Sequence, residues 1–198
     1  ICFESCYSMD GDFAPIEAIC DIADRYNAFT YVDEVHAVGL YGPHGAGVTE
    51  RDGLQGRIDM IQGTLSKGFG AIGGYIAGTH EAVDFIRSHA SGFIFSTALP
   101  PSVVAGIRAA LRHLREDGAQ RQALARRAAS LKTRMIENGI PVMPSPSHIL
   151  PVMIGDAALA KAITDHLMVE SGIYIQPINY PTVPRGTERL RITPTPLH

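Results

Sequence analysis

A single lysine in a glycine-rich segment raises the question of covalent chemistry. The segment from Gly63 to Gly74 reads GTLSKGFGAIGG, and it holds Lys67, two hydroxyl side chains and five glycines. A lysine attacks a carbonyl carbon only as the neutral amine, which burial or a neighbouring cation favours. The hydroxyls of Thr64 and Ser66 are suited to hold a phosphate, and glycines let a backbone approach a ligand closely. By itself, the segment is equally consistent with an exposed lysine in a flexible loop.

The same segment contains the spacing GxGxxG between Gly68 and Gly73, which is typical of dinucleotide-binding loops. Such a loop follows a buried strand, opens a helix and is followed by an acid about twenty residues later. Here polar residues precede Gly68, a strand-like run follows Gly73, and no acid lies between Phe85 and Thr97. A Walker loop needs a glycine directly before its lysine, where this chain has Ser66. We therefore interpret the glycine spacing as accidental.

An acid lies where a β-rich run ends, in the segment from Tyr31 to His36, YVDEVH. Open α/β sheets bind ligands at the carboxyl ends of their strands. Pyridoxal phosphate (PLP) chemistry needs a lysine for a Schiff base and an acid that keeps the pyridine nitrogen protonated, so that the ring can accept electrons. Asp33 and Lys67 are of the required types and follow two successive strand-like runs. The alternatives are a turn or helix cap for Asp33 and a half-buried histidine with satisfied hydrogen bonds for His36.

Strand-like runs alternate with helical periodicity along the chain, which predicts an α/β fold with a mostly parallel sheet and room for an antiparallel strand. In the first part we expect strands at 1–3, 29–33, 58–62 and 75–78, a loop at 40–47, and helices at 14–26, at 80–89 and from Pro100 onward. In the second part we expect a helix around 124–135, a strand at 149–154, a helix at 157–171, and strands at 173–178 and 189–192. Gly139 and Gly172 fit as the C-terminal caps of the two later helices. These patterns place a domain boundary between residues 112 and 113, with domains at 1–112 and 113–198.

The composition limits the class of protein. The chain has 198 residues, a formal net charge of −3, 45 % hydrophobic residues and 19 % charged residues, which is ordinary for a globular protein. The slightly acidic balance gives no electrostatic reason to expect nucleic acid. No uncharged apolar run reaches the roughly 18 residues of a membrane span. The cysteines Cys2, Cys6 and Cys20 lack the spacing of a metal site, so we expect reduced thiols and no bound metal.

The chain opens inside a strand-like run, Ile1 to Ser5. A native amino terminus rarely begins within a core strand, so we expect a fragment that lacks its N-terminal part. We expect a cytoplasmic protein of bacterial type. A mitochondrial matrix location would require a transit segment lost with the missing part.

Four separated strings resemble the α-oxoamine synthases, which are PLP-dependent enzymes of fold type I. In order, the strings are YVDEVHAVGLYGPHGAGVTERDG, GTLSKGFGAIGGYIAG, GFIFSTALPP and NYPTVPRGTERLRITPTPLH, and the likeness runs nearly the full length. The resemblance implies part of an aspartate-aminotransferase-like large domain, followed by a smaller α/β domain. The closest match is the branch that makes 5-aminolevulinate. It implies an acyltransferase that condenses glycine with succinyl-CoA and releases coenzyme A and carbon dioxide, the first step of tetrapyrrole and haem biosynthesis.

The resemblance also implies roles for residues that match these motifs. Lys67 would bind PLP covalently and later move the proton at the glycine α-carbon, while Asp33 would pair with the pyridine nitrogen. His36 and Ser8 would lie at the cofactor, near its phenolic oxygen. Thr64 would bind the cofactor phosphate.

Three further residues are placed by the resemblance alone. Ser96 and Thr97, in the string FIFSTALPP, would reach the phosphate bound to the neighbouring subunit. This implies a homodimer with its active site at the subunit interface. Thr182 would lie against the substrate.

Two arginines alternate with apolar residues near the end of the chain. Period-two alternation in a strand puts Arg189 and Arg191 on one side and the apolar residues on the other. A planar guanidinium can hold a carboxylate through two hydrogen bonds. The resemblance assigns the substrate carboxylate to Arg191. For Arg189 we expect a structural ion pair, with Glu188 or another acid.

Two rival interpretations stay open. A sister enzyme, of the glycine C-acetyltransferase or 8-amino-7-oxononanoate synthase type, would use the same PLP core with another amino acid or acyl-CoA. The stretch PRGTER favours 5-aminolevulinate, but acyl selection in the family depends partly on the N-terminal part. From another class, the chain could be a non-catalytic nucleotide-binding module. Cys6, His44 and His148 are expected to be core or loop residues.

Overall fold

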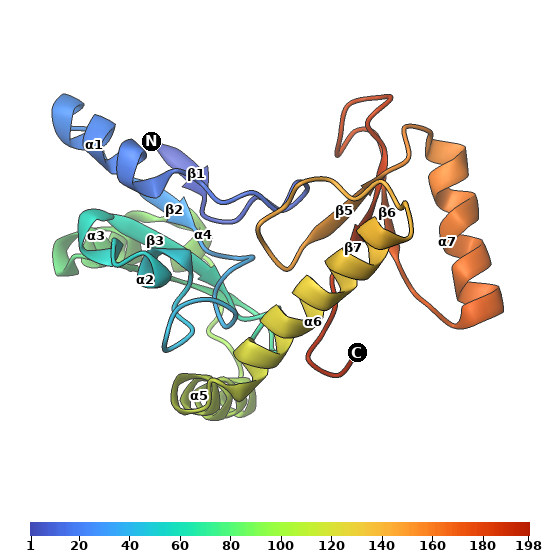
Figure 1. Cartoon of the computed structure of the whole chain (residues 1–198). Helices are drawn as coiled ribbons and strands as arrows, with labels where there is room; N and C mark the ends of the chain where they lie inside the picture. The colour runs from blue at the N-terminus through green and yellow to red at the C-terminus, as the bar shows by residue number, and fades with distance from the viewer. The chain divides into compact units, whose positions relative to one another are not determined.

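A computed structural model describes all residues from 1 to 198 (Figure 1). The chain forms two compact units. Unit 1 comprises Ile1–Cys6 and Phe13–Arg121, and unit 2 comprises Tyr7–Asp12 and Gln122–His198. A short segment near the N-terminus therefore belongs to the same unit as the C-terminal third of the chain. The boundary expected between residues 112 and 113 concerns folding domains and stays a prediction.

Unit 1 is built on a four-stranded sheet with the strand order β1-β2-β3-β4. Its strands are β1 (Cys2–Glu4), β2 (Tyr31–Asp33), β3 (Met60–Thr64) and β4 (Gly74–Gly78). The first three strands run parallel, and β4 runs antiparallel to β3. A parallel neighbour needs a long crossover connection, whereas β3 and β4 are joined only by the segment 65–73. The predicted α/β class, a mostly parallel sheet with an antiparallel member, is confirmed.

The helices of unit 1 follow from their caps and apolar faces. The elements are α1 (Ile16–Tyr26), α2 (Val48–Arg51), a 3-10 turn (Gln55–Arg57), α3 (His80–His89), α4 (Ser91–Ile94), α5 (Pro101–Glu116) and the start of α6 (Ala119–Glu137). Helix α1 buries Ile16, Cys20 and Ala23, which lie on one face. Helix α3 begins after Thr79, whose hydroxyl accepts the amide hydrogen of Ala82 at 3.2 Å. The single-turn helices α2 and α4 lie where the sequence predicted no helix.

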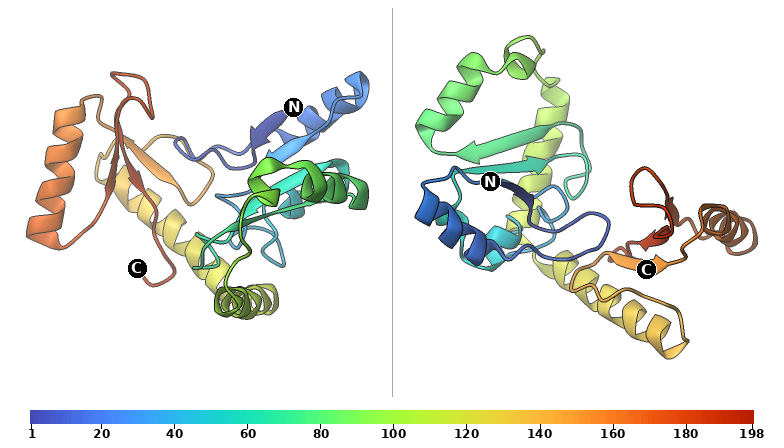
Figure 2. Two further views of the ribbon diagram at one scale, coloured as in Figure 1. Left: turned by 180° about the vertical axis from the view of Figure 1, so that it is seen from behind. Right: turned by 90° about the horizontal axis from the view of Figure 1, so that it is seen from above.

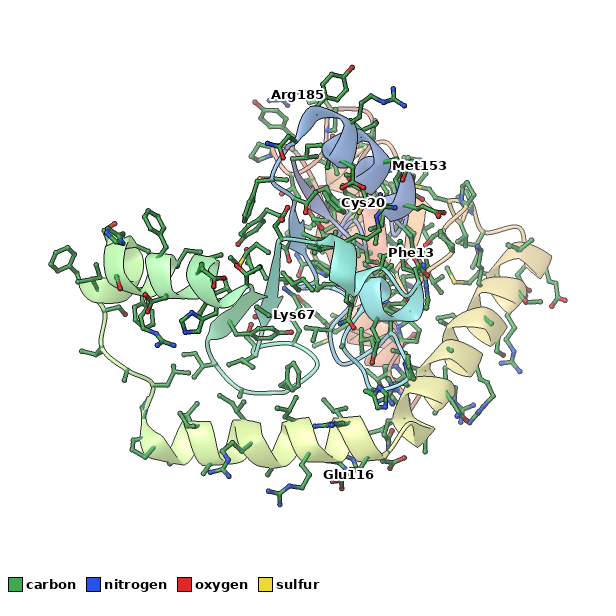
Figure 3. All side chains as sticks on the ribbon, turned by 90° about the vertical axis from the view of Figure 1, so that its left-hand side faces the viewer. Phe13, Cys20, Lys67, Glu116, Met153 and Arg185 are labelled. Carbon is green, nitrogen blue, oxygen red and sulfur yellow. The ribbon has the colours of Figure 1, made fainter.

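A small hydrophobic core lies under the β3–β4 connection. Val38, Leu65 and Phe69 are buried there, and the apolar stripe of α5 packs on them through Ile107, Ala110 and Leu114. Figure 3 shows this connection, with Lys67 labelled, on the side of the sheet that faces α5. Ile107, Ala110 and Leu114 are spaced three and four residues apart, which places them on one face of α5.

Unit 2 contains a three-stranded antiparallel sheet with the order β5-β7-β6. Its elements are the remainder of α6, β5 (Leu150–Met153), α7 (Ala157–Ser171), β6 (Gln176–Ile178) and β7 (Arg189–Ile192). Both views of Figure 2 show α7 alongside the small sheet, and α7 contacts β6 and β7. One core joins both helices to the sheet, through Met135, Leu150, Val152, Ala160 and Leu190.

The predicted strand at 173–178 is wrong in its first half, because β6 begins only at Gln176. Gly172 ends α7 in the left-handed conformation, with φ of 65°. Ile173 and Tyr174, which follow it, are exposed and carry no strand pairing. The predicted helix at 157–171 and the predicted strand at 189–192 are confirmed.

Candidate functional site

The sheet of unit 1 brings three predicted site residues to one edge. Asp33 is the last residue of β2 and lies opposite Gln62 of β3 in the parallel register. Thr64 ends β3, and Lys67 follows three residues later. Asp33 and Thr64 are half-buried, while Lys67 is exposed. An acid, a hydroxyl and an amine thus follow the carboxyl ends of adjacent parallel strands, where ligands bind in open α/β sheets.

The loop that carries Lys67 is closed by its own hydrogen bonds. The amide of Leu65 donates to the carbonyl of Gly73 at 2.9 Å, and the amide of Gly70 donates to the carbonyl of Lys67 at 3.0 Å. The hydroxyl oxygens of Thr64 and Ser66 are 2.8 Å apart. Leu65 and Phe69 are buried on either side of the lysine. The buried side chains of Leu65 and Phe69 therefore anchor the loop on both sides of Lys67. The hydroxyls of Thr64 and Ser66 lie in the same loop.

Gly68 lets this loop touch the turn that follows His36. A Cβ atom at Gly68 would lie 2.7 Å from the carbonyl oxygen of Val38 and 3.3 Å from Cα of Gly39. We expected the glycines to give a ligand room. At Gly68 the room is used by the protein backbone itself. The GxGxxG spacing does not form a dinucleotide-binding loop, because Gly74, the residue after Gly73, begins the strand β4 and not a helix.

The Asp33 carboxylate is held by its own turn. Its Oδ1 accepts the amide hydrogen of Val35 at 2.7 Å. His36 lies in the same turn and is half-buried. The expected alternative role of Asp33 as a turn cap is therefore present in the structure, and it leaves the second carboxylate oxygen of Asp33 for other partners.

Ser96 and Thr97 are exposed in the stretch between α4 and α5. Two aromatic neighbours, Phe93 and Phe95, are also exposed, at 60 % and 87 %. The structure thus places both hydroxyl residues at the surface of unit 1. Their contact with a neighbouring subunit stays a prediction.

Unit 2 brings together Ser8 and Arg191. The Nε atom of Arg191 donates to the carbonyl oxygen of Ser8 at 2.6 Å, and both residues are half-buried. Thr182 is exposed in the segment before β7. Six predicted site residues therefore belong to unit 1 (Asp33, His36, Thr64, Lys67, Ser96 and Thr97), and Ser8, Thr182 and Arg191 belong to unit 2.

Arg189 forms the structural ion pair that the alternation predicted, but with a different acid. Its Nη1 atom pairs with Asp10, and its Nε donates to the carbonyl of Thr187 at 3.0 Å. Glu188 instead accepts the amide hydrogen of Gly186 at 2.9 Å. The sequence missed Asp10 because 179 positions separate it from Arg189. Both arginines contact the segment Tyr7–Asp12, as expected for residues on one side of a strand.

His148 belongs to the surroundings of Arg191. Burial, and secondly the charge of Arg191, lower the pKa of His148 to about 4. The imidazole is therefore neutral at pH 7, in keeping with the core or loop role that the sequence indicated.

Glu34 is the main residue that sequence reasoning missed. It follows Asp33 directly, and its side chain is fully buried with four hydrogen-bond donors around it. The available signal was a second acid directly after Asp33, between the apolar residues Val32 and Val35. No three His, Cys, Asp or Glu side chains come together as metal ligands. No helix combines the length and apolar character needed to span a membrane.

Comparison with known proteins identifies the family. The sequence profile described as "Aminotransferase class I and II" matches residues 1–198. The chain belongs to this family. Its structural neighbours are PLP-dependent enzymes of fold type I, which confirms the predicted fold class. A serine palmitoyltransferase of S. paucimobilis with a bound PLP–myriocin aldimine superposes with a TM-score of 0.93 at 33 % identity, over all of this chain and 50 % of that one.

Among curated family members, the chain is 60 % identical over 198 residues to the 5-aminolevulinate synthase of Rhizobium meliloti, covering all of this chain and 49 % of that protein. It is 53 % identical to the erythroid-specific mitochondrial 5-aminolevulinate synthase of Delphinapterus leucas, of which it covers 34 %. The chain thus spans about half the length, or less, of the curated relatives that it matches. The recognised resemblance to 5-aminolevulinate synthases is confirmed.

Proposed function

We propose that this chain is the part of a 5-aminolevulinate synthase that carries the PLP-binding lysine. The observation that carries the proposal is the position of Asp33 and Lys67 after adjacent parallel strands, in a chain 60 % identical to a named synthase. The complete enzyme would condense glycine with succinyl-CoA and release coenzyme A and carbon dioxide. The sister reactions lack a comparable supporting observation, because relatives that are 53–60 % identical over all of this chain are named 5-aminolevulinate synthases.

The residues at the edge of the sheet fit PLP. A carboxylate on Asp33, an amine on Lys67 and paired hydroxyls on Thr64 and Ser66 match the pyridine nitrogen, the aldehyde and the phosphate of this cofactor. When bound, PLP supplies an electron sink that stabilises negative charge on the carbon next to the substrate nitrogen.

The residues of the chain would do the remaining work. Lys67 would be the point of covalent attachment and, once released, the base that takes the proton from the glycine α-carbon. Asp33 would keep the pyridine nitrogen protonated, with its carboxylate orientation fixed by the amide of Val35. Arg191 would hold the glycine carboxylate, and its bond to the Ser8 carbonyl would fix the plane of the guanidinium.

The proposal includes assembly and location. The active enzyme would be a homodimer in which Ser96 and Thr97 reach the cofactor phosphate of the partner, with His36 and Ser8 near the phenolic oxygen and Thr182 near the substrate. The domains would be 1–112 and 113–198, and the compartment would be the cytoplasm. The 198 residues by themselves would bind PLP weakly, because further cofactor contacts are expected from the longer protein.

Borohydride reduction tests the proposal in the complete protein. This chain holds three lysines, at positions 67, 132 and 161, so mapping the labelled peptide distinguishes Lys67 from the other two. After PLP is added and reduced, we expect a pyridoxyl group on Lys67, none in Lys67→Ala, and unchanged labelling in Lys161→Ala, which alters an exposed lysine of α7. An adduct on another lysine, or none in the wild type, would contradict the proposal.

The acyl substrate is tested separately. Turnover with succinyl-CoA should exceed turnover with acetyl-CoA and pimeloyl-CoA at equal concentrations. A preference for either of the others would assign the chain to a sister enzyme while leaving the PLP site intact.

A further inference from the structure

We propose that Glu34 is a positioning residue, whose buried carboxylate fixes the turn that carries Asp33 and His36. The inference rests on the proposed function, because it concerns how the site for PLP is held. It is carried by hydrogen bonds within unit 1, first among them those of the Glu34 side chain to Ser5, Val48 and Thr49.

The Glu34 carboxylate is saturated with donors. Its Oε2 accepts from the Ser5 hydroxyl at 2.5 Å and from the Val48 amide at 3.0 Å. Its Oε1 accepts from the amide and the hydroxyl of Thr49 at 2.8 and 2.6 Å. Glu34 has no exposed surface. The side chain therefore ties the turn after β2 to the first residues of α2 and to the end of β1.

Backbone hydrogen bonds of Ser5 and Glu34 connect this network to Asp33 and to the next strand. The amide of Ser5 donates to the carbonyl of Asp33 at 2.9 Å, and the amide of Glu34 donates to the carbonyl of Gln62 at 2.8 Å. The amide of Val35 in turn holds the Asp33 carboxylate. A shift of Glu34 would move both residues that flank it, and with them the acid proposed to face the pyridine nitrogen.

Packing alone does not account for a carboxylate in this place. No lysine, arginine or histidine forms an ion pair with Glu34. Burying a carboxylate with hydrogen bonds but no cation costs more free energy than burying an apolar side chain of similar size. The surrounding loop is also shaped to the carboxylate, since a Cβ atom on Gly47 would lie 2.4 Å from it. We infer that the carboxylate is present to hold backbone donors in place.

Glutamine cannot replace Glu34 without loss. Each carboxylate oxygen accepts one backbone amide, from Val48 or from Thr49, and neither amide can turn round to accept a hydrogen bond. In Glu34→Gln, the NH2 group must face one of these donors in either orientation of the side-chain amide. The turn would then lose at least one anchor although the shape of the side chain is kept.

Glu50 provides a matched control. It lies on α2 and accepts the amide hydrogens of His44 and Ala46 at 3.1 and 2.9 Å, so it too holds this loop by backbone bonds. Its hydrogen-bond partners do not include the turn that carries Asp33. Glu50→Gln should therefore weaken the loop and leave that turn in place.

The experiment compares Glu34→Gln, Ser5→Ala and Glu50→Gln in the complete protein. Two quantities are measured: the PLP dissociation constant, by fluorescence titration, and the amide hydrogen exchange of the peptide containing Glu34–His36 without PLP. For Glu34→Gln we expect about a tenfold weaker affinity and about tenfold faster exchange. We expect about a threefold change in both for Ser5→Ala, and less than about twofold for Glu50→Gln.

Equal exchange of the turn in Glu34→Gln and the wild type would overturn the inference, as would equal effects of Glu34→Gln and Glu50→Gln. If Glu34→Gln does not fold, Ser5→Ala decides, and an unchanged exchange rate in that variant overturns the inference. A wild type that binds no PLP would refute the proposed function instead, and the exchange measurement would still test the role of Glu34.

Discussion

Arg189 and Asp10 form an ion pair whose partners differ in burial. The Arg189 side chain is 7 % exposed, whereas the Asp10 side chain is 47 % exposed. The pair joins β7 to the segment Tyr7–Asp12 within unit 2. Because of this asymmetry the two partners are not equivalent. Losing the acid leaves a buried guanidinium without its counter-ion, whereas losing the arginine leaves a carboxylate that water can solvate.

Removing Asp10 should therefore cost more stability than removing Arg189. We expect Asp10→Ala to lower the free energy of unfolding by about 2 kcal/mol, and Arg189→Met, which fills similar space, to lower it by less. Asp165→Ala, which breaks the exposed pair with Lys161, should cost under about 0.5 kcal/mol. Urea unfolding at pH 7 measures all three, and an equal loss for Asp10→Ala and Asp165→Ala would contradict the asymmetry.

Replacing Arg191 by lysine should impair substrate binding more than folding. Lysine keeps the positive charge but has no Nε–H donor to bond the Ser8 carbonyl while its end group holds a carboxylate. We expect the KM for glycine to rise about a hundredfold in Arg191→Lys, with the urea midpoint close to that of the wild type. Arg134→Lys, on the exposed surface of α6, is the control and should change neither quantity. A normal KM for Arg191→Lys would argue against the carboxylate role.

Two glycine substitutions should have opposite signs. Gly106 lies inside α5 with open space around its Cβ position, so Gly106→Ala should raise the free energy of unfolding by about 0.5–1 kcal/mol. Gly68→Ala should lower it by about 1–3 kcal/mol, because the new methyl group would lie 2.7 Å from the carbonyl of Val38. Thermal or urea unfolding separates the two. A neutral Gly68→Ala would show that the contact between the two backbones relaxes easily.

His148 should make unit 2 less stable in acid. Its pKa is lowered from 6.5 to about 4, so the neutral form is favoured in the folded state. The resulting stability is fully present above about pH 6.5 and is lost as the pH falls through about 4, with a total of about 3 kcal/mol. The difference in urea stability between pH 7 and pH 4.5 should shrink in His148→Gln. It should stay unchanged in His166→Gln, which alters an exposed histidine of α7; an unchanged difference in both would contradict this role.

Local sequence predicted most of the elements but not every boundary. The helix at 157–171 and the strand at 189–192 were predictable because a terminal glycine and strict alternation act within a few residues. Residues 173–175 were misassigned, since their apolar character suits a strand but no partner strand lies beside them. The one-turn helices α2 and α4 are too short to show a periodic pattern.

The sequence by itself determined the α/β class, the family and the residue types for the chemistry, because motifs and periodicity are local properties of the chain. Lys67, Asp33 and Arg191 could all be named before any contact was known. Only the tertiary structure decided what holds them. Glu34 joins positions up to 29 residues apart, and Arg189 finds its acid 179 positions away. Partners so distant along the chain are selected by the packing of strands and loops, which no local pattern encodes.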